Sequence, residues 1–197
     1  MATRNVRARI LLTRELPSTP VLEAVLTVWW LGDRFHAREE SGRILSAVAG
    51  DVTEPRGFGK VPRTMEAIMD SRLPLSGHLD VHGELAAEHA WVTEPHGAQW
   101  KAPLERVSPI PAQLFATGLE GLAPSGREQF LGRDCAEYVT HLEGRDDAGP
   151  FRSRVRRLVV GPYVLLRDVT AEAGPMRLRA AVTALDEGVV RESDLKP

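Results

Sequence analysis

Residues 176–185, with the sequence MRLRAAVTAL, alternate apolar and polar side chains along most of their length. In an extended chain, one side carries Met176, Leu178, Ala180 and Val182, and the other carries Arg177, Arg179, Ala181 and Thr183. A period of two with one dry and one wet side predicts a half-buried antiparallel strand. Similar short runs, separated by Gly, Pro and Asp, continue from Gly126 to Pro197. The last third of the chain therefore predicts a set of paired strands.

The N-terminal part predicts a second group of strands behind a loosely held arm, residues 1–20. The run 21–31 is rich in Val, Leu, Thr and Trp and is apolar on both sides, which predicts a central strand. Gly32-Asp33 suits a two-residue hairpin turn, since Gly accepts positive φ freely. A return strand over 34–39 and a third strand over 44–49 complete a meander.

The middle of the chain predicts helices. An amphipathic helix is expected over 63–71, a second over 83–91, where Ala, Glu and Leu are good helix formers, and a helical turn over 112–117. The expected fold is therefore α+β, with a curved, largely antiparallel sheet of about seven or eight strands. Helices from residues 60 to 118 cover one face, and residues 21–197 form a single domain.

Composition excludes some functions and leaves others open. The chain has 197 residues, of which 43% are hydrophobic and 26% charged, and a net charge of −2. This balance gives no reason to expect nucleic-acid binding or broad attraction to anionic membranes. One cysteine, no secretory signal pattern and no long apolar run favour a cytoplasmic location without stable membrane insertion. The alternating Arg152, Arg154 and Arg156 predict a solvated charged sheet face, with a phosphate or acidic-partner site as the alternative.

Residues capable of catalysis are present, but they form no strong motif. His78, His82 and His89 lie close in sequence, and a metal site is possible because histidines four residues apart share a helix face. Gly77 and Gly83 argue against such a helix. Cys135 lies within an expected strand and is interpreted as a core residue rather than a nucleophile. No nucleophile elbow or phosphate-binding glycine loop occurs, and no cofactor is expected.

Tryptophan and methionine provide the better candidate for a site. These side chains are large and adaptable, and they would suit an apolar pocket between the sheet and its helices. Packing in an ordinary core is the alternative explanation. The candidate ligand-binding residues are Trp29, Trp30, Met65, Ile68, Met69, Trp91 and Trp100.

Three stretches together resemble a known group. They are LGDRFHAREESGR at 31–43, GREQFLGRDCAEY at 126–138 and LLRD at 165–168. With a Gly-Arg-x-Cys/Ala-x-x-Tyr strand opening and a later hairpin, they resemble the lipoprotein-carrier superfamily, the LolA/RseB/LppX-like fold. The resemblance implies an unclosed antiparallel half-barrel around a helical plug, with an apolar cavity for acyl chains or a protein partner. Members of that group are exported or lipid-anchored, and no export signal is recognised here.

Together these observations predict a non-enzymatic binding protein with an apolar pocket, for a lipid-like ligand or a partner protein segment. A metal-dependent enzyme that uses His78, His82 and His89 is one alternative. The other is a regulatory protein-interaction module that works through sheet edges or the N-terminal arm.

Overall fold

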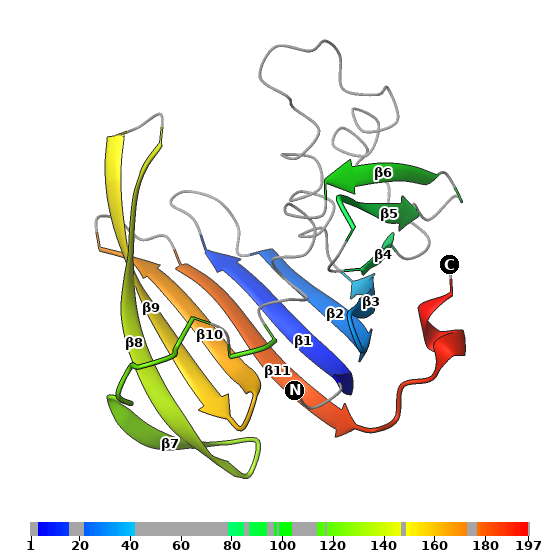
Figure 1. The fold of residues 1–197 in the computed structure, drawn as a ribbon. Helices are drawn as coiled ribbons and strands as arrows, with labels where there is room; N and C mark the ends of the chain where they lie inside the picture. The colour runs from blue at the N-terminus through cyan, green and yellow to red at the C-terminus, as the bar shows by residue number, and fades with distance from the viewer. Residues whose placement is uncertain are drawn as a thin grey trace.

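A computed structural model describes residues 4–15, 22–41, 79–84, 87–93, 97, 99–103, 114–116, 118–146, 149–172 and 177–196. These residues form one open sheet of 11 strands, in the order β6-β5-β4-β3-β2-β1-β11-β10-β9-β8-β7 (Figure 1). Every neighbouring pair is antiparallel. The strands are β1 (Asn5–Glu15), β2 (Leu22–Leu31), β3 (Arg34–Ser41), β4 (Leu79–Glu84), β5 (His89–Thr93), β6 (Gln99–Pro103), β7 (Gly126–Phe130), β8 (Arg133–Asp146), β9 (Gly149–Val160), β10 (Tyr163–Ala171) and β11 (Arg177–Glu187).

Strand β1 occupies the middle of the sheet, although it lies within the stretch 1–20 that was expected to be an arm. It pairs with β2 on one side and with β11 on the other, so the two ends of the chain meet there. The reason is visible in the alternation of buried Val6 and Ala8 with exposed Arg7 and Arg9. This strand is half-buried because its apolar side faces the core.

The β2–β3 hairpin confirms the strand prediction for this region. Gly32 has φ of 62° and forms the turn with Asp33, a conformation that costs glycine little. Strand β2 is interior, between β1 and β3, as its apolar composition indicated. The predicted strand at 44–49 lies outside the described residues.

The α+β prediction, with helices covering one face, is wrong. The described residues contain no α-helix, and their only helical element is the 3-10 turn η1 (Glu192–Leu195). The segment expected to be a helix over 83–91 instead ends β4 and begins β5. Helix propensity is a weak preference, and here pairing with neighbouring strands overrides it: Ala90 and Val92 are buried while His89 and Trp91 are exposed. The expected helix over 63–71 lies outside the described residues.

The C-terminal third forms paired strands, as its alternating pattern predicted. A tight turn separates β7 from β8. Leu131 and Gly132 form this turn, with φ of 51° and 69°. After β11, the chain continues to η1.

β6 and β7 are consecutive strands in the chain and lie at opposite edges of the sheet. The described part of the connection between them, from residue 114 onward, runs over β10, β9 and β8 (Figure 1). The Leu114 carbonyl accepts from the Val164 amide, and the Ala116 amide donates to the Pro162 carbonyl, at 2.8 Å each. Leu119 then packs on Val159 and Val164.

The core lies on the face of the sheet that carries the apolar side of β1 and β2. Trp30 is fully buried and contacts the rings of Phe35 and Phe115, with ring centroids 5.0 and 5.3 Å away. Val28 and Leu26 are also fully buried. Within the described ranges, no helix has the length and apolar character needed to cross a membrane.

Candidate functional site

The strand register divides the sheet into two faces. The apolar face carries every second residue of β1 and β2, and the polar face carries the residues between them. One row of cross-strand partners on the apolar face can be followed through six strands from β2 to β8. It consists of Ala24, Leu12, Ala180, Arg167, Arg157 and Tyr138. This row begins in the core and ends among charged side chains.

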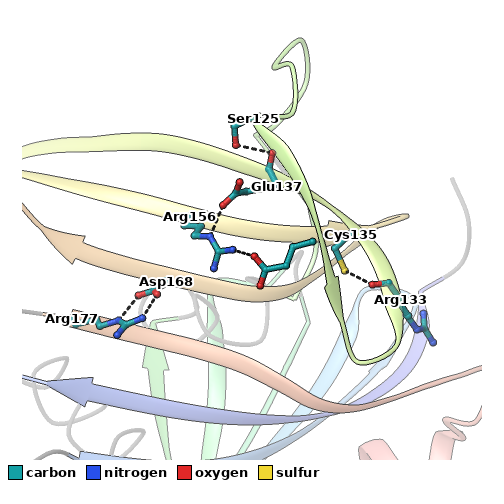
Figure 2. Close-up of polar contacts among 8 residues, drawn as sticks. Ser125, Arg133, Cys135, Glu137, Arg156, Asp168 and Arg177 are labelled. Carbon is teal, nitrogen blue, oxygen red and sulfur yellow. Dashed lines mark hydrogen bonds and ion pairs between the residues drawn. The ribbon is translucent and has the colours of Figure 1, made fainter.

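The polar face of β7–β11 carries matched ion pairs. Arg156 lies between Glu137 and Glu128, and Asp168 faces Arg177 on the next strand (Figure 2). The Arg156 Nε–Glu137 Oε1 distance is 2.5 Å, and the two Arg177–Asp168 contacts measure 2.9 and 2.5 Å. These hydrogen bonds hold the pKa values of Glu137 and Asp168 below their usual range. In these two groups, carboxylates compensate the charges of Arg156 and Arg177.

Arg152, Arg154 and Arg156 share this polar face, as the alternation predicted. Arg154 lies opposite Thr170, and Arg156 lies opposite Asp168. Arg152 and Arg154 are exposed, and Arg152 pairs with Glu143 and Glu172. The prediction of a charged sheet face open to solvent is confirmed.

The apolar face is incompletely buried toward the far ends of β8 and β11. We name this area the open patch and define it by Tyr138, Leu142, Arg157, Arg167, Leu178 and Ala180. Leu142 is 48% exposed and Leu178 is 38% exposed, while Val169 and Val155, in the same cross-strand row as Leu178, are buried. Isolated exposed leucines are ordinary, but here they continue the face that forms the core.

Arg157 and Arg167 stand directly opposite each other in the open patch, on β9 and β10. Burial lowers the pKa of both guanidinium groups, and the charge of Arg157 adds to the effect on Arg167. Arg157 Nη1 donates to Thr140 Oγ1 at 3.1 Å. Arg167 Nε is buried and has no hydrogen-bond partner in the described part of the chain. Within the described residues, neither side chain pairs with a carboxylate.

A second cluster lies on the polar face of β2–β4. The rings of Trp29, His36 and His82 stack in sequence, with centroid separations of 4.7 and 4.1 Å. His36 Nε2 contacts Asp80 at 2.5 Å, and His36 Nδ1 contacts the Asp194 carbonyl of η1 at 2.9 Å. A carboxylate and a backbone carbonyl thus lie within hydrogen-bond distance of the two ring nitrogens of His36. The cluster thus fastens η1 to the sheet.

The electrostatics of this cluster favour a neutral His82 and an ionised Asp80. Burial lowers the pKa of His82, and the charge of His36 lowers it further. Burial opposes the ionisation of Asp80, but hydrogen bonds from His36 and Arg38 outweigh it and lower the pKa of Asp80. His82 Nδ1 is buried and has no hydrogen-bond partner.

The predicted metal set does not assemble as the sequence suggested. His82 lies beside His36 and Asp80, whereas His89 is exposed on β5 and His78 lies outside the described residues. Ligand atoms of His36, Asp80 and His82 lie within 4.8 Å of one another. However, the two imidazole planes are stacked at only 15°, so one ion cannot lie in both ring planes. The observed arrangement is a hydrogen-bonded clamp rather than a formed metal centre.

The predicted tryptophan site is dispersed over both faces. Trp30 lies in the core on the apolar face, whereas Trp29 stacks on His36 on the polar face. Trp91 is exposed, with the Lys101 ammonium 4.8 Å from its ring centroid. Trp100 belongs to β6, but its side chain lies outside the described residues. Met65, Ile68 and Met69 also lie outside them.

Cys135 is buried in the core cluster, as predicted. Burial raises the pKa of its thiol, which disfavours the thiolate that nucleophilic catalysis needs. Its Sγ contacts the Arg133 carbonyl at 3.5 Å (Figure 2). The residue is therefore a packing element of β8.

The sequence carries a signal for the arginine pair in the spacing of its apolar residues. Arg157 falls in phase with Val155 and Val159, and Arg167 falls between Leu165 and Val169. An arginine in phase with apolar neighbours is expected on an apolar face, where a charge is costly. Two arginines of this kind, on adjacent strands, mark the open patch.

The fold defines this chain as an open, all-antiparallel sheet protein. No protein-family model and no curated protein matches it. An uncharacterized conserved protein from Thermus thermophilus is similar in structure, with a TM-score of 0.50 and 11% identity over 100% of this chain and 86% of that one. At this identity the comparison establishes a shared fold.

Other solved structures match less closely. A LolA superfamily protein from Nitrosomonas europaea has a TM-score of 0.44 and 10% identity over 100% of this chain and 92% of that one. A DUF1329 family protein from Desulfovibrio piger has a TM-score of 0.35 and 11% identity over 99% and 90%.

Proposed function

We propose that this chain is a non-enzymatic binding protein that holds an apolar or amphiphilic small molecule against the open patch. The observation that carries the proposal is the continuity of the apolar face. The rows that form the buried core in β1 and β2 extend into β11, β10, β9 and β8, where Leu178 and Leu142 are partly exposed. Apolar surface that remains in contact with water gains free energy when a ligand covers it.

The surrounding chemistry also supports binding rather than catalysis. The described thiol is buried, and the ion pairs of the polar face are internally matched. A binding surface needs apolar area with a few polar groups that orient the ligand. The open patch contains both, in its leucines and its arginines.

The direct test is binding of a neutral amphiphile, dodecanol, measured by isothermal titration calorimetry and native mass spectrometry. Leu178→Gln should weaken binding, because it places an amide on the apolar surface. Val189→Gln is the matched control, since Val189 is 46% exposed but follows the end of β11, outside the open patch. If Leu178→Gln binds dodecanol as tightly as the unsubstituted protein, the ligand does not lie on this patch.

A further inference from the structure

The open patch contains an uncompensated concentration of positive charge. Arg157 and Arg167 are cross-strand partners, and like charges directly opposite each other are destabilising. Both groups are also partly removed from water, as their lowered pKa values reflect. Guanidinium groups remain protonated at any physiological pH. The sheet therefore maintains two positive charges side by side at a cost in stability.

Other arginines of the same sheet form ion pairs with carboxylates. Arg156 is adjacent to Arg157 in sequence but points to the opposite face, where Glu137 and Glu128 bind it. Arg177 is held by both oxygens of Asp168. Among the described residues, the Arg157 guanidinium has only the Thr140 hydroxyl as a partner, and Arg167 retains a buried Nε without a partner. The difference lies between two faces of one sheet, so local sequence composition does not explain it.

An irregularity in the β9–β10 ladder creates the pair. The register shifts between Val164 and Leu166. Tyr163 pairs with Val160 before the shift. If that register continued, Arg157 would lie opposite Leu166 and would not face Arg167. Extra residues of this kind re-aim side chains and are common beside functional sites.

We propose that Arg157 and Arg167 together bind one carboxylate or phosphate group at the head of an amphiphilic ligand. Guanidinium groups present paired N–H donors that match the oxygens of such anions. The anion would satisfy Arg167 Nε and relieve the repulsion between the two charges. The apolar chain of the ligand then covers Leu178 and Ala180 or Leu142; this part of the inference rests on the proposed function.

The test compares ligands that differ only in the head group. Dodecanoate, dodecyl phosphate, dodecanol and free inorganic phosphate are titrated against the protein at constant ionic strength. Hydrogen bonds to charged groups predict that dodecanoate or dodecyl phosphate binds about ten- to a hundredfold more tightly than dodecanol. Arg167→Met should remove this advantage, so that the anionic amphiphiles bind no more tightly than dodecanol, and Arg157→Met should do the same. Arg156→Met, on the polar face, is the control that keeps the advantage.

The outcomes separate this inference from the proposed function. Equal affinity for dodecanol and both anionic amphiphiles in the unsubstituted protein overturns the anion site and leaves the binding function standing. Binding of inorganic phosphate that depends on Arg167, with no amphiphile bound, supports the anion site with a free anion as its ligand and overturns the binding function. Absence of binding by every ligand overturns both. Arg167→Lys, which keeps the charge but loses the paired donors, should show an intermediate advantage.

Discussion

Arg157 and Arg167 lie directly opposite each other on neighbouring strands, on the face of the sheet that elsewhere forms the core. Like charges are normally kept apart in such positions, and a carboxylate normally neutralises a partly buried arginine. Within the described residues neither condition is met. A stability cost that the fold retains is a common property of binding sites, because ligand binding offsets the cost.

The first prediction is that Arg167→Met stabilises the free protein. Removing one of the two charges ends the cross-strand repulsion and the desolvation of Arg167, so the free energy of unfolding should rise by about 1 kcal/mol. Arg156→Met should instead lower it by about 0.5–1 kcal/mol, because partly exposed ion pairs contribute this much. Urea denaturation at fixed ionic strength measures both changes. A loss of stability in Arg167→Met would show that the arginine is compensated in the free protein.

The β7–β8 turn offers a second stabilising substitution. Leu131 has φ of 51° and is exposed, and Phe130 pairs with Arg133 to close the two-residue loop. Leucine is strained in this conformation and asparagine tolerates it, so Leu131→Asn should stabilise the protein by about 0.5–1 kcal/mol. Gly132→Ala should destabilise it by about 1 kcal/mol, since Gly132 has φ of 69°. Thermal unfolding of the two variants should give shifts of opposite sign; a lower Tm for Leu131→Asn would contradict the argument.

Two adjacent tryptophans should differ strongly in their contribution to stability. Trp30→Ala removes a fully buried ring from the core and should cost about 3–5 kcal/mol. Trp29→Ala removes a ring that stacks on His36 on the polar face, with an expected cost of about 1 kcal/mol. Urea denaturation compares the two variants. Similar losses would mean that the two residues do not serve different faces.

The regular strands were predictable because the alternation of side chains reflects their burial. β9 shows the alternation, with Arg152 and Arg154 exposed and Ser153 and Val155 buried. β2 was recognised from an apolar run on both sides, and glycine marks the β2–β3 turn. β1 has the same alternation, but both of its partners had to be known before residues 5–15 could be recognised as part of the sheet. One of them, β11, lies at the other end of the chain. Pairing over such a separation leaves no local signal.

The middle segment was mispredicted because its composition and its pairing disagree. Ala, Leu and Glu favour a helix over 83–91, yet cross-strand contacts on both sides of β4 and β5 decide the outcome.

The arginine pair was unpredictable for a different reason. Its register depends on a shift between Val164 and Leu166, and no turn residue at that point in the sequence marks a shift. Trp29 and Trp30 were grouped as one site, although alternation itself assigns adjacent strand residues to opposite faces.

The clamp between η1 and the sheet predicts a dependence of stability on pH. Burial and the charge of His36 lower the pKa of His82 below its unfolded value of 6.5. The charge of Asp80 raises this pKa by a smaller amount, and the charge of Arg38 lowers it. As pH falls through 6.5, the unfolded chain binds a proton at this position before the folded protein does. The free energy of unfolding should therefore decrease on acidification, by at most about 1.4 kcal/mol per pH unit, until His82 is protonated in the folded state.

His82→Asn should reduce the slope of the free energy of unfolding against pH between about pH 7.5 and pH 5.5, measured by urea denaturation. His89→Asn, an exposed substitution on the neighbouring strand β5, is the control. An unchanged slope in His82→Asn would show that this histidine is protonated equally in both states, and that the stacked cluster does not couple η1 to pH.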